Sequence, residues 1–249
     1  MHTKRIIGFY GFPPRWVTEE FRDIYPDNQW VDLDIDFGNP DSGILPDNYC
    51  RILRNIMDNA VFLKESIDIV IASTGSEKCE GGRYIAYLLK EMGFRVAVTR
   101  NDSDETSIDS SEVYVPISKS GLPLATKIDL IMKTVLEDSR ERYDEVQPSY
   151  GFWGVPPHDF ELLKLFPDTT HVYGWTRCVE AGRPSNLNLE CYVEPLVPTV
   201  FFVQSFCAKS QLARYLAEKH GGLFVDADGP IGMGTRAKIE AFLELNKPK

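Results

Sequence analysis

The stretch Gly8-Phe9-Tyr10-Gly11-Phe12-Pro13-Pro14 returns later in the chain as Gly151-Phe152-Trp153-Gly154-Val155-Pro156-Pro157. Five of the seven positions are identical, and the other two keep an aromatic or apolar side chain. Each copy continues through an apolar helical pattern to a Pro-Asp pair, at positions 26–27 and 167–168, and then into a β-like run. Because self-similarity of this kind marks repeated structural units, we interpret the chain as an internal duplication of one α/β half.

Around the first copy, short apolar runs alternate with helical patterns. Residues 67–72 form an almost continuous apolar run, which is typical of a strand buried on both faces. Apolar residues at helical spacing predict helices between the runs, and this alternation favours a mainly parallel sheet flanked by helices. The predicted order is strand 6–10, helix 16–25, strand 31–37, helix 47–64, strand 67–72, a helix ending at Met92, and strand 94–98.

The second copy repeats much of this order. Its pattern predicts strand 149–153, helix 158–166, strand 171–176, an alternating run at 187–193, strand 199–203, helix 208–220, strand 223–226 and a final helix. Residues 101–121 are rich in acids and serines and are interpreted as a loop or crossover. Helix 124–142 follows them and matches the final helix of the chain. We therefore predict two similar α/β lobes, 1–121 and 122–249, and leave open whether their terminal helices are exchanged.

The balance of charged residues is acidic. With 27 Lys and Arg against 37 Asp and Glu, the 249 residues carry a net charge of −10 and the pI is near 5.0. A nucleic acid or an anionic membrane needs a basic surface, so neither is expected as the main partner. The first residues show no signal-peptide pattern and no run is long enough to cross a membrane, which predicts a cytoplasmic protein. A homo-oligomer is left open.

The predicted site follows from the sheet. In open parallel sheets, ligands bind beyond the carboxyl ends of the strands, where backbone groups and helix N-termini converge. Two related lobes would line a common cleft with these ends, and a small anionic metabolite is the expected ligand. The predicted ligand-binding residues at the strand ends are Tyr10, Gly11, Ser73, Thr74, Gly75, Ser76, Arg100, Trp153, Gly154, Arg177, Ser205 and Asp228. Residues 73–76 resemble an anion cradle, although such runs are equally common as plain turns.

Two cysteines are candidate catalytic residues. Cys79 and Cys207 each follow a predicted buried strand and precede a helix, where a thiol can serve as a nucleophile or proton carrier. This arrangement is similar to that of the aspartate/glutamate racemase superfamily, which has one cysteine at each such junction. The family's strand-end Cys-Asn-Thr pattern is absent here, and inert packing is the alternative for both thiols. His158 is the third candidate, as an acid or base.

Metal and cofactor signals are weak. Asp32, Asp34 and Asp36 alternate along the predicted strand 31–37, and a solvated edge-strand face is favoured over a cation site. The Gly229–Gly234 loop follows Asp226 and Asp228, which could hold Mg²⁺, but a tight turn before a helix is favoured. The five cysteines, which include Cys50, Cys178 and Cys191, are scattered and predict neither a disulfide framework nor a zinc site. No cofactor is indicated.

These patterns predict an enzyme that binds and transforms a small anionic metabolite between its lobes. Acid–base chemistry of the isomerase, racemase or lyase kind fits the candidate residues. Two alternatives stay open: a non-catalytic protein that binds or senses a small molecule, and an enzyme similar to tetrapyrrole or metal chelatases, which also have two similar α/β lobes.

Overall fold

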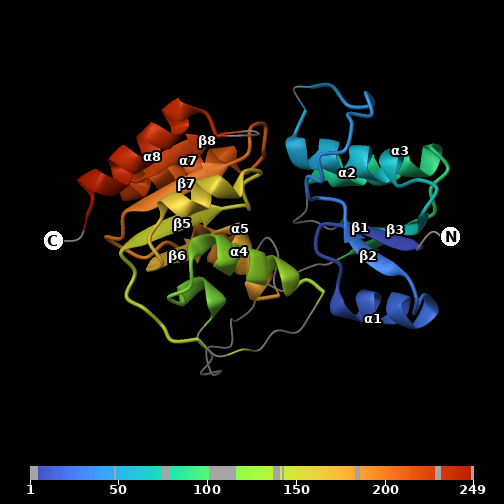
Figure 1. Cartoon of the computed structure of the whole chain (residues 1–249), viewed down its shortest axis with the longest axis horizontal. Coiled ribbons are helices and arrows are strands. Elements are labelled where there is room, and N and C mark those ends of the chain that lie inside the picture. Colours follow the sequence, from blue (N-terminus) through green and yellow to red (C-terminus); the bar gives the residue numbers. More distant parts are fainter. Residues whose placement is uncertain are drawn as a thin grey trace. The chain divides into compact units, whose positions relative to one another are not determined.

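The computed structural model describes residues 5–47, 49–74, 79–100, 116–136, 141, 143–182, 186–227 and 231–247. It contains two compact units, Met1–Asp102 (unit 1) and Ser103–Lys249 (unit 2), and each is described by itself. Each unit has its own parallel sheet and its own buried core (Figure 1). The α/β class is therefore confirmed.

Unit 1 has four parallel strands in the order β2-β1-β3-β4. The strands are β1 (Ile6–Tyr10), β2 (Gln29–Asp32), β3 (Ile67–Thr74) and β4 (Val96–Arg100), and the helices are α1 (Arg15–Ile24), α2 (Arg51–Phe62) and α3 (Glu80–Glu91). Helices α2 and α3 lie on one face of the sheet and α1 lies on the other (Figure 1). The order reverses between β1 and β3, which makes their carboxyl ends the topological switch point of this sheet.

The predicted buried strand is confirmed in unit 1. Seven of the eight residues of β3 are buried, and Val70 and Ala72 pack in the core below α2 and α3. Ile56 and Met57 of α2 are fully enclosed there because the apolar residues of this helix lie on the face toward the sheet. This core fixes where the carboxyl ends of the strands lie.

The alternating run 31–37 does not form one strand, so the prediction of an edge-strand face with three carboxylates is wrong. Strand β2 ends at Asp32, whose Oδ1 accepts a hydrogen bond from the backbone N–H of Asp34 at 3.0 Å. Asp36 repeats the turn, because its Oδ1 accepts from the N–H of Gly38 at 2.6 Å. Aspartate side chains that bond the backbone two residues on compete with strand pairing.

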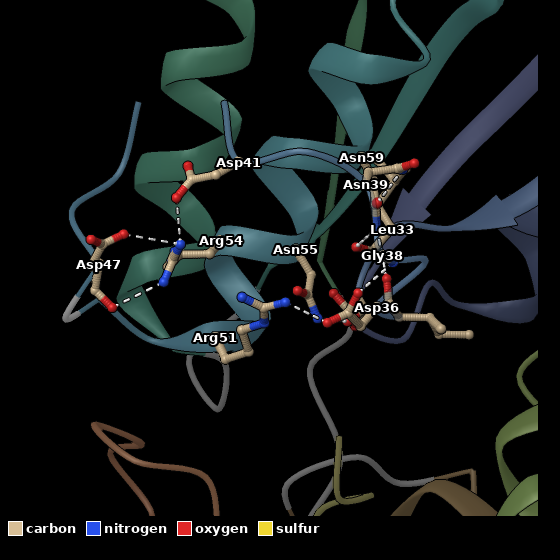
Figure 2. Close-up of polar contacts among 12 residues, drawn as sticks. Leu33, Asp36, Gly38, Asn39, Asp41, Asp47, Arg51, Arg54, Asn55 and Asn59 are labelled. Carbon is tan, nitrogen blue, oxygen red and sulfur yellow. Dashed lines mark hydrogen bonds and ion pairs between the residues drawn. The ribbon is translucent and has the colours of Figure 1, made fainter. Parts of the chain in front are cut away.

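Helix α2 holds the segment that follows β2 (Figure 2). The Asn59 side chain donates to the carbonyl oxygens of Leu33 at 3.0 Å and Ile35 at 2.7 Å, and thus takes the place of a neighbouring strand. Arg51 donates to the Asp36 carboxylate at 2.5 Å. These acids therefore interact with the protein's own backbone and arginines.

Unit 2 also has four parallel strands, in the order β6-β5-β7-β8. The strands are β5 (Tyr150–Gly154), β6 (Thr170–Tyr173), β7 (Thr199–Val203) and β8 (Leu223–Asp226). The helices are α4 (Leu124–Lys133), α5 (Trp175–Glu180), α6 (Leu187–Cys191), α7 (Ser210–His220) and α8 (Met233–Leu245), with two 3₁₀ helices, η1 (Ile117–Lys119) and η2 (Phe160–Leu165). Apolar residues of α4, η2 and α8 share one core, whereas α7 packs with residues of the other sheet face.

Several predicted elements of unit 2 differ in the structure. Strand 171–176 ends at Tyr173, and the next residues form α5. The alternating run 187–193 is the short helix α6, because Asn186 caps it by accepting from the N–H of Leu189 at 3.1 Å. Helix 158–166 is the 3₁₀ helix η2, and α4 ends at Lys133 rather than near 142.

Helix α4 is anchored to unit 2 by a buried lysine. Lys127 is fully buried, and its Nζ donates to the carbonyl oxygens of Asp168 at 2.7 Å and Thr170 at 2.6 Å. Burial lowers the pKa of the Lys127 ammonium to about 8, against the smaller opposite effect of the Asp168 charge. The lysine thus joins the helix to the turn that begins β6.

The two copies of the motif occupy matching places in the two sheets. Gly8 lies in β1 and Gly151 lies in β5, and each of these strands is the second in the order of its sheet. Gly154, the last residue of β5, has φ +149°, and a Cβ there would meet the carbonyl oxygen of Phe202 at 2.1 Å, so the position requires glycine. This agreement is compatible with two similar lobes. The duplication itself, and the predicted shared cleft, stay predictions.

Candidate functional site

The carboxyl edge of the unit 1 sheet is acidic. Tyr10 is buried and its hydroxyl donates to the carbonyl oxygen of Gly82 at 2.7 Å, so its ring belongs to the core and offers no face for stacking. The N–H of Gly11 donates to Asp34 Oδ2 at 3.0 Å. Burial and then the Asp34 charge raise the pKa of the Asp32 carboxyl well above its usual value. A pair of neighbouring carboxyls at this position disfavours an anionic ligand.

The hydroxyls predicted to bind a ligand in unit 1 are engaged within the fold. Ser73 Oγ donates to the carbonyl oxygen of Phe12 at 2.6 Å, and Thr74 Oγ1 donates to that of Thr99 at 3.1 Å. Both hydroxyls are buried and tie the motif turn and β4 to the end of β3. Arg100 ends β4 with an exposed side chain. The predicted residues Gly75, Ser76 and Asp228 lie outside the described residues.

The two candidate cysteines have different surroundings. Cys79 is exposed at the N-cap of α3. Cys207 is half-buried, packs against the core beneath α7, and lies three residues before that helix begins. Cys79 is seven residues beyond Ala72, and Cys207 is six beyond Phe201, the residues that pair with the motif aromatics (79 − 72 and 207 − 201). The two thiols are therefore offset by one position.

At the carboxyl edge of unit 2, the motif residues are again structural. Trp153 is fully buried, and its Nε1 donates to the carbonyl oxygen of Glu190 at 2.6 Å. The carbonyl oxygen of Gly154 accepts from Thr176 Oγ1 at 2.8 Å. Together these bonds fix α5 and α6 over the ends of β5 and β6, which positions the charged side chains that those helices carry.

Arg177 lies on α5 beside a buried glutamate. Its Nη1 is 3.2 Å from Glu180 Oε2, and the side chains are 24% and 4% exposed. The other glutamate oxygen, Oε1, accepts from the N–H of Ser118 at 3.1 Å. One oxygen of this carboxylate is therefore held by a backbone N–H, while the guanidinium beside the other oxygen stays partly exposed.

Lys209 forms a second pair of the same kind. It follows β7 and precedes α7, and its ammonium binds the carboxylate of Glu190, with the side chains 24% and 6% exposed. Both cations act on the buried thiol of Cys178: burial and then Glu190 raise its pKa to about 12, whereas Lys209 and Arg177 lower it. The charges of both ion pairs therefore act on the same buried thiol, and both cations follow carboxyl ends of strands in one sheet.

Three further groups surround this edge. Ser205 Oγ donates to Asp226 Oδ1 at 2.6 Å, between the ends of β7 and β8. Gln204 Nε2 donates to the carbonyl oxygen of Pro156 at 3.2 Å, which links the end of β7 to the second motif turn. His158, just after that turn, is half-buried. We call Arg177, Glu180, Glu190 and Lys209, with the loop 204–208, the unit 2 edge site.

Metal ligands, membrane-spanning helices and known protein families do not assign a function to this site. Among the described residues, no three His, Cys, Asp or Glu side chains form a group suited to a metal ion. No helix within those same ranges has the length and apolar character needed to span a bilayer. No protein-family model matches the chain, and no curated protein sequence is detectably similar to it.

Sequence reasoning found Arg177 but missed its neighbours. Glu180 follows it by three residues, the spacing of an ion pair on a helix, so a helical interpretation of 175–180 would have found that pair. Glu190 and Lys209 are joined across 19 residues and a strand, and no local pattern signals their contact. Their pairing emerges only from the fold.

Proposed function

We propose that the chain binds a small anionic metabolite at the unit 2 edge site, through Arg177 and Lys209. The observation that carries this proposal is that each cation is partly exposed while its glutamate partner is buried. Desolvating a carboxylate is costly, and an exposed pair contributes little stability. A buried carboxylate beside a partly exposed cation is instead suited to fixing the direction of donors toward a ligand.

The position of the pairs supports the same proposal. Both cations follow the carboxyl ends of parallel strands, where ligands of such sheets bind. At the matching edge of unit 1, Asp32 and Asp34 accept from backbone N–H groups, whereas the two carboxylates of the unit 2 edge site are each paired with a partly exposed cation. An anion is therefore favoured at unit 2. The predicted contribution of Arg100 and residues 73–76 is not needed for this version of the proposal.

Calorimetric titration tests it. Inorganic phosphate, succinate and benzoate are titrated into the full chain and into Arg177→Met and Lys209→Met variants. Loss of one charge-assisted hydrogen bond should weaken binding by about 10- to 100-fold. Arg236→Met and Lys164→Met remove exposed, ion-paired cations elsewhere in unit 2 and should leave affinity unchanged.

Two results would count against the proposal. One is the lack of saturable binding of any anion by the unmodified chain. The other is equal affinity in the site variants and the control variants, accompanied by lower thermal stability in the site variants alone. That second result would assign the two ion pairs to holding α5, α6 and α7 together.

Transformation of the bound anion is the second part of the proposal. Cys207 and His158 belong to the same unit as the cations and are its candidate proton carriers, whereas Cys79 belongs to unit 1. Racemase- or isomerase-like chemistry exchanges a carbon-bound proton with solvent. Deuterium incorporation into a bound ligand in D₂O, lost in Cys207→Ser or His158→Asn, would support an enzyme. Saturable binding without exchange would favour the non-catalytic binding protein.

A further inference from the structure

An exposed aromatic residue with unusual backbone geometry borders the unit 2 edge site. Phe206 follows β7 and has φ +60°, in the left-handed region that bulky residues rarely adopt. Its side chain is 67% exposed. Glycine would take this backbone conformation without strain and without exposing a ring to water. The phenyl group is thus presented to solvent at a cost in stability.

Gln204, two residues before Phe206, supplies an independent observation. Gln204 is buried, and its Oε1 has no hydrogen-bond donor among the described residues. Its Nε2 is held by the carbonyl oxygen of Pro156, so the amide cannot simply turn away. A buried acceptor without a partner is costly, and a ligand donor is one way to satisfy it. Lys209, one of the two proposed anion-binding cations, lies three residues beyond Phe206.

We propose that Phe206 forms the specificity wall of the unit 2 edge site and that the ligand is a planar carboxylate of the aromatic or conjugated class, which also carries an N–H or O–H donor for Gln204 Oε1. This inference rests on the proposed anion binding by Arg177 and Lys209. An exposed ring in the loop that leads to Lys209 favours a ligand with a flat apolar body next to its charged group. Stacking on the ring supplies the apolar contact, and the carboxylate meets the cations.

The chain offers a matched control for backbone strain. Leu196 has φ +66° and is fully exposed, but it precedes β7 and lies toward the opposite, amino edge of the sheet. If strain at an exposed residue were only a feature of loop geometry, substitution at either position would have the same effect on ligand binding. If Phe206 is a ligand contact, only its substitution changes binding.

The test compares Phe206→Gly and Leu196→Gly by calorimetric titration with benzoate, cyclohexanecarboxylate and inorganic phosphate. Removing the ring should weaken benzoate binding by about tenfold and leave phosphate binding unchanged, because stacking contributes only to the planar ligand. The unmodified chain should prefer benzoate to the non-planar cyclohexanecarboxylate. Leu196→Gly should bind all three as the unmodified chain does. Phe206→Asn, which also tolerates the left-handed region, replaces the glycine variant if that variant fails to fold.

The outcomes separate this inference from the proposed function. Unchanged benzoate affinity in Phe206→Gly, or no preference for benzoate, overturns the specificity wall even where phosphate binding still depends on Arg177 and Lys209. Anion binding that is indifferent to both cations overturns the proposed function, and this inference with it.

Discussion

The buried Lys127 makes the stability of unit 2 depend on pH in a direction that can be worked out. The unfolded lysine has a pKa of 10.5, and the folded value is about 8, a difference of about 2.5 (10.5 − 8). Between these values the unfolded state binds a proton that the folded state has lost. The free energy of unfolding therefore rises as the pH increases from 8 to 10.5.

The size of the effect follows from the same two values. Each unit of pKa difference corresponds to 1.36 kcal/mol, so raising the pH from 7.5 to 9.5 should add about 2 kcal/mol to the free energy of unfolding through Lys127. Cys178 partly offsets this gain, because its pKa is raised to about 12 and the unfolded thiol ionises above about pH 8.5. Buried tyrosines set the upper limit of the pH range in which this gain can be measured. Burial raises the pKa of Tyr150 and Tyr173, and such groups lower stability once the unfolded tyrosines ionise above about pH 10.

Urea unfolding at pH 7.5, 8.5 and 9.5 measures this effect. Replacing Trp16 and Trp30 by Phe leaves the two unit 2 tryptophans, one of them Trp153, as the fluorescent probes. The rise should be present in this background and absent when Lys127→Met is added. Lys133→Met, an exposed lysine on the same helix, should keep it. Equal pH profiles for the lysine-127 variant and the background would refute the assignment of a depressed pKa to Lys127.

Three further outcomes are expected. Gly154→Ala should lower the free energy of unfolding by more than about 2 kcal/mol, because the added Cβ would collide with the backbone of Phe202. Denaturation at fixed pH measures this loss, and an unchanged midpoint would contradict the register of β5 and β7. Cys79 should react with a thiol reagent in the native state, whereas Cys178 should react only on unfolding, because it is buried and its pKa is raised to about 12. Mass-mapped labelling distinguishes the two thiols, and modification of Cys178 in the folded protein would contradict its burial. Burial lowers the pKa of His171, so stability should fall as the pH drops below 6.5, where only the unfolded histidine gains a proton; His171→Asn should flatten that acid limb of the unfolding curve.

The regular elements of the fold could be predicted where burial alone determines structure. The apolar runs at β3 and β7 and the apolar stripe of α2 follow from period and composition, and the structure confirms them. Alternation was misleading where side chains bond the backbone. The run after Asp32 alternates like a strand, but aspartate turns and the Asn59 amide use its backbone groups instead. An Asn cap makes 187–191 helical in the same way.

The carboxyl edges of the two sheets could be predicted from the sequence, but the side chains that gather there could not. The rule for parallel sheets located the carboxyl edges, and it selected Arg177. The motif aromatic Trp153 was expected to meet a ligand, whereas its indole nitrogen supports the backbone of Glu190. The Glu190–Lys209 contact depends on tertiary packing across β7, for which a single sequence carries no local signal. Charge pairing between distant segments therefore requires the fold.

Side-chain NMR of arginine tests anion binding at the unit 2 edge site most directly. The Nε–H resonance of Arg177 is followed during titration with benzoate, beside those of the exposed Arg83 and Arg236. The expected result is a saturable shift of the Arg177 resonance, whose midpoint moves to an about 10- to 100-fold higher benzoate concentration in Lys209→Met. Small linear shifts of all three resonances, with no saturation and no dependence on Lys209, would contradict an anion site at this edge.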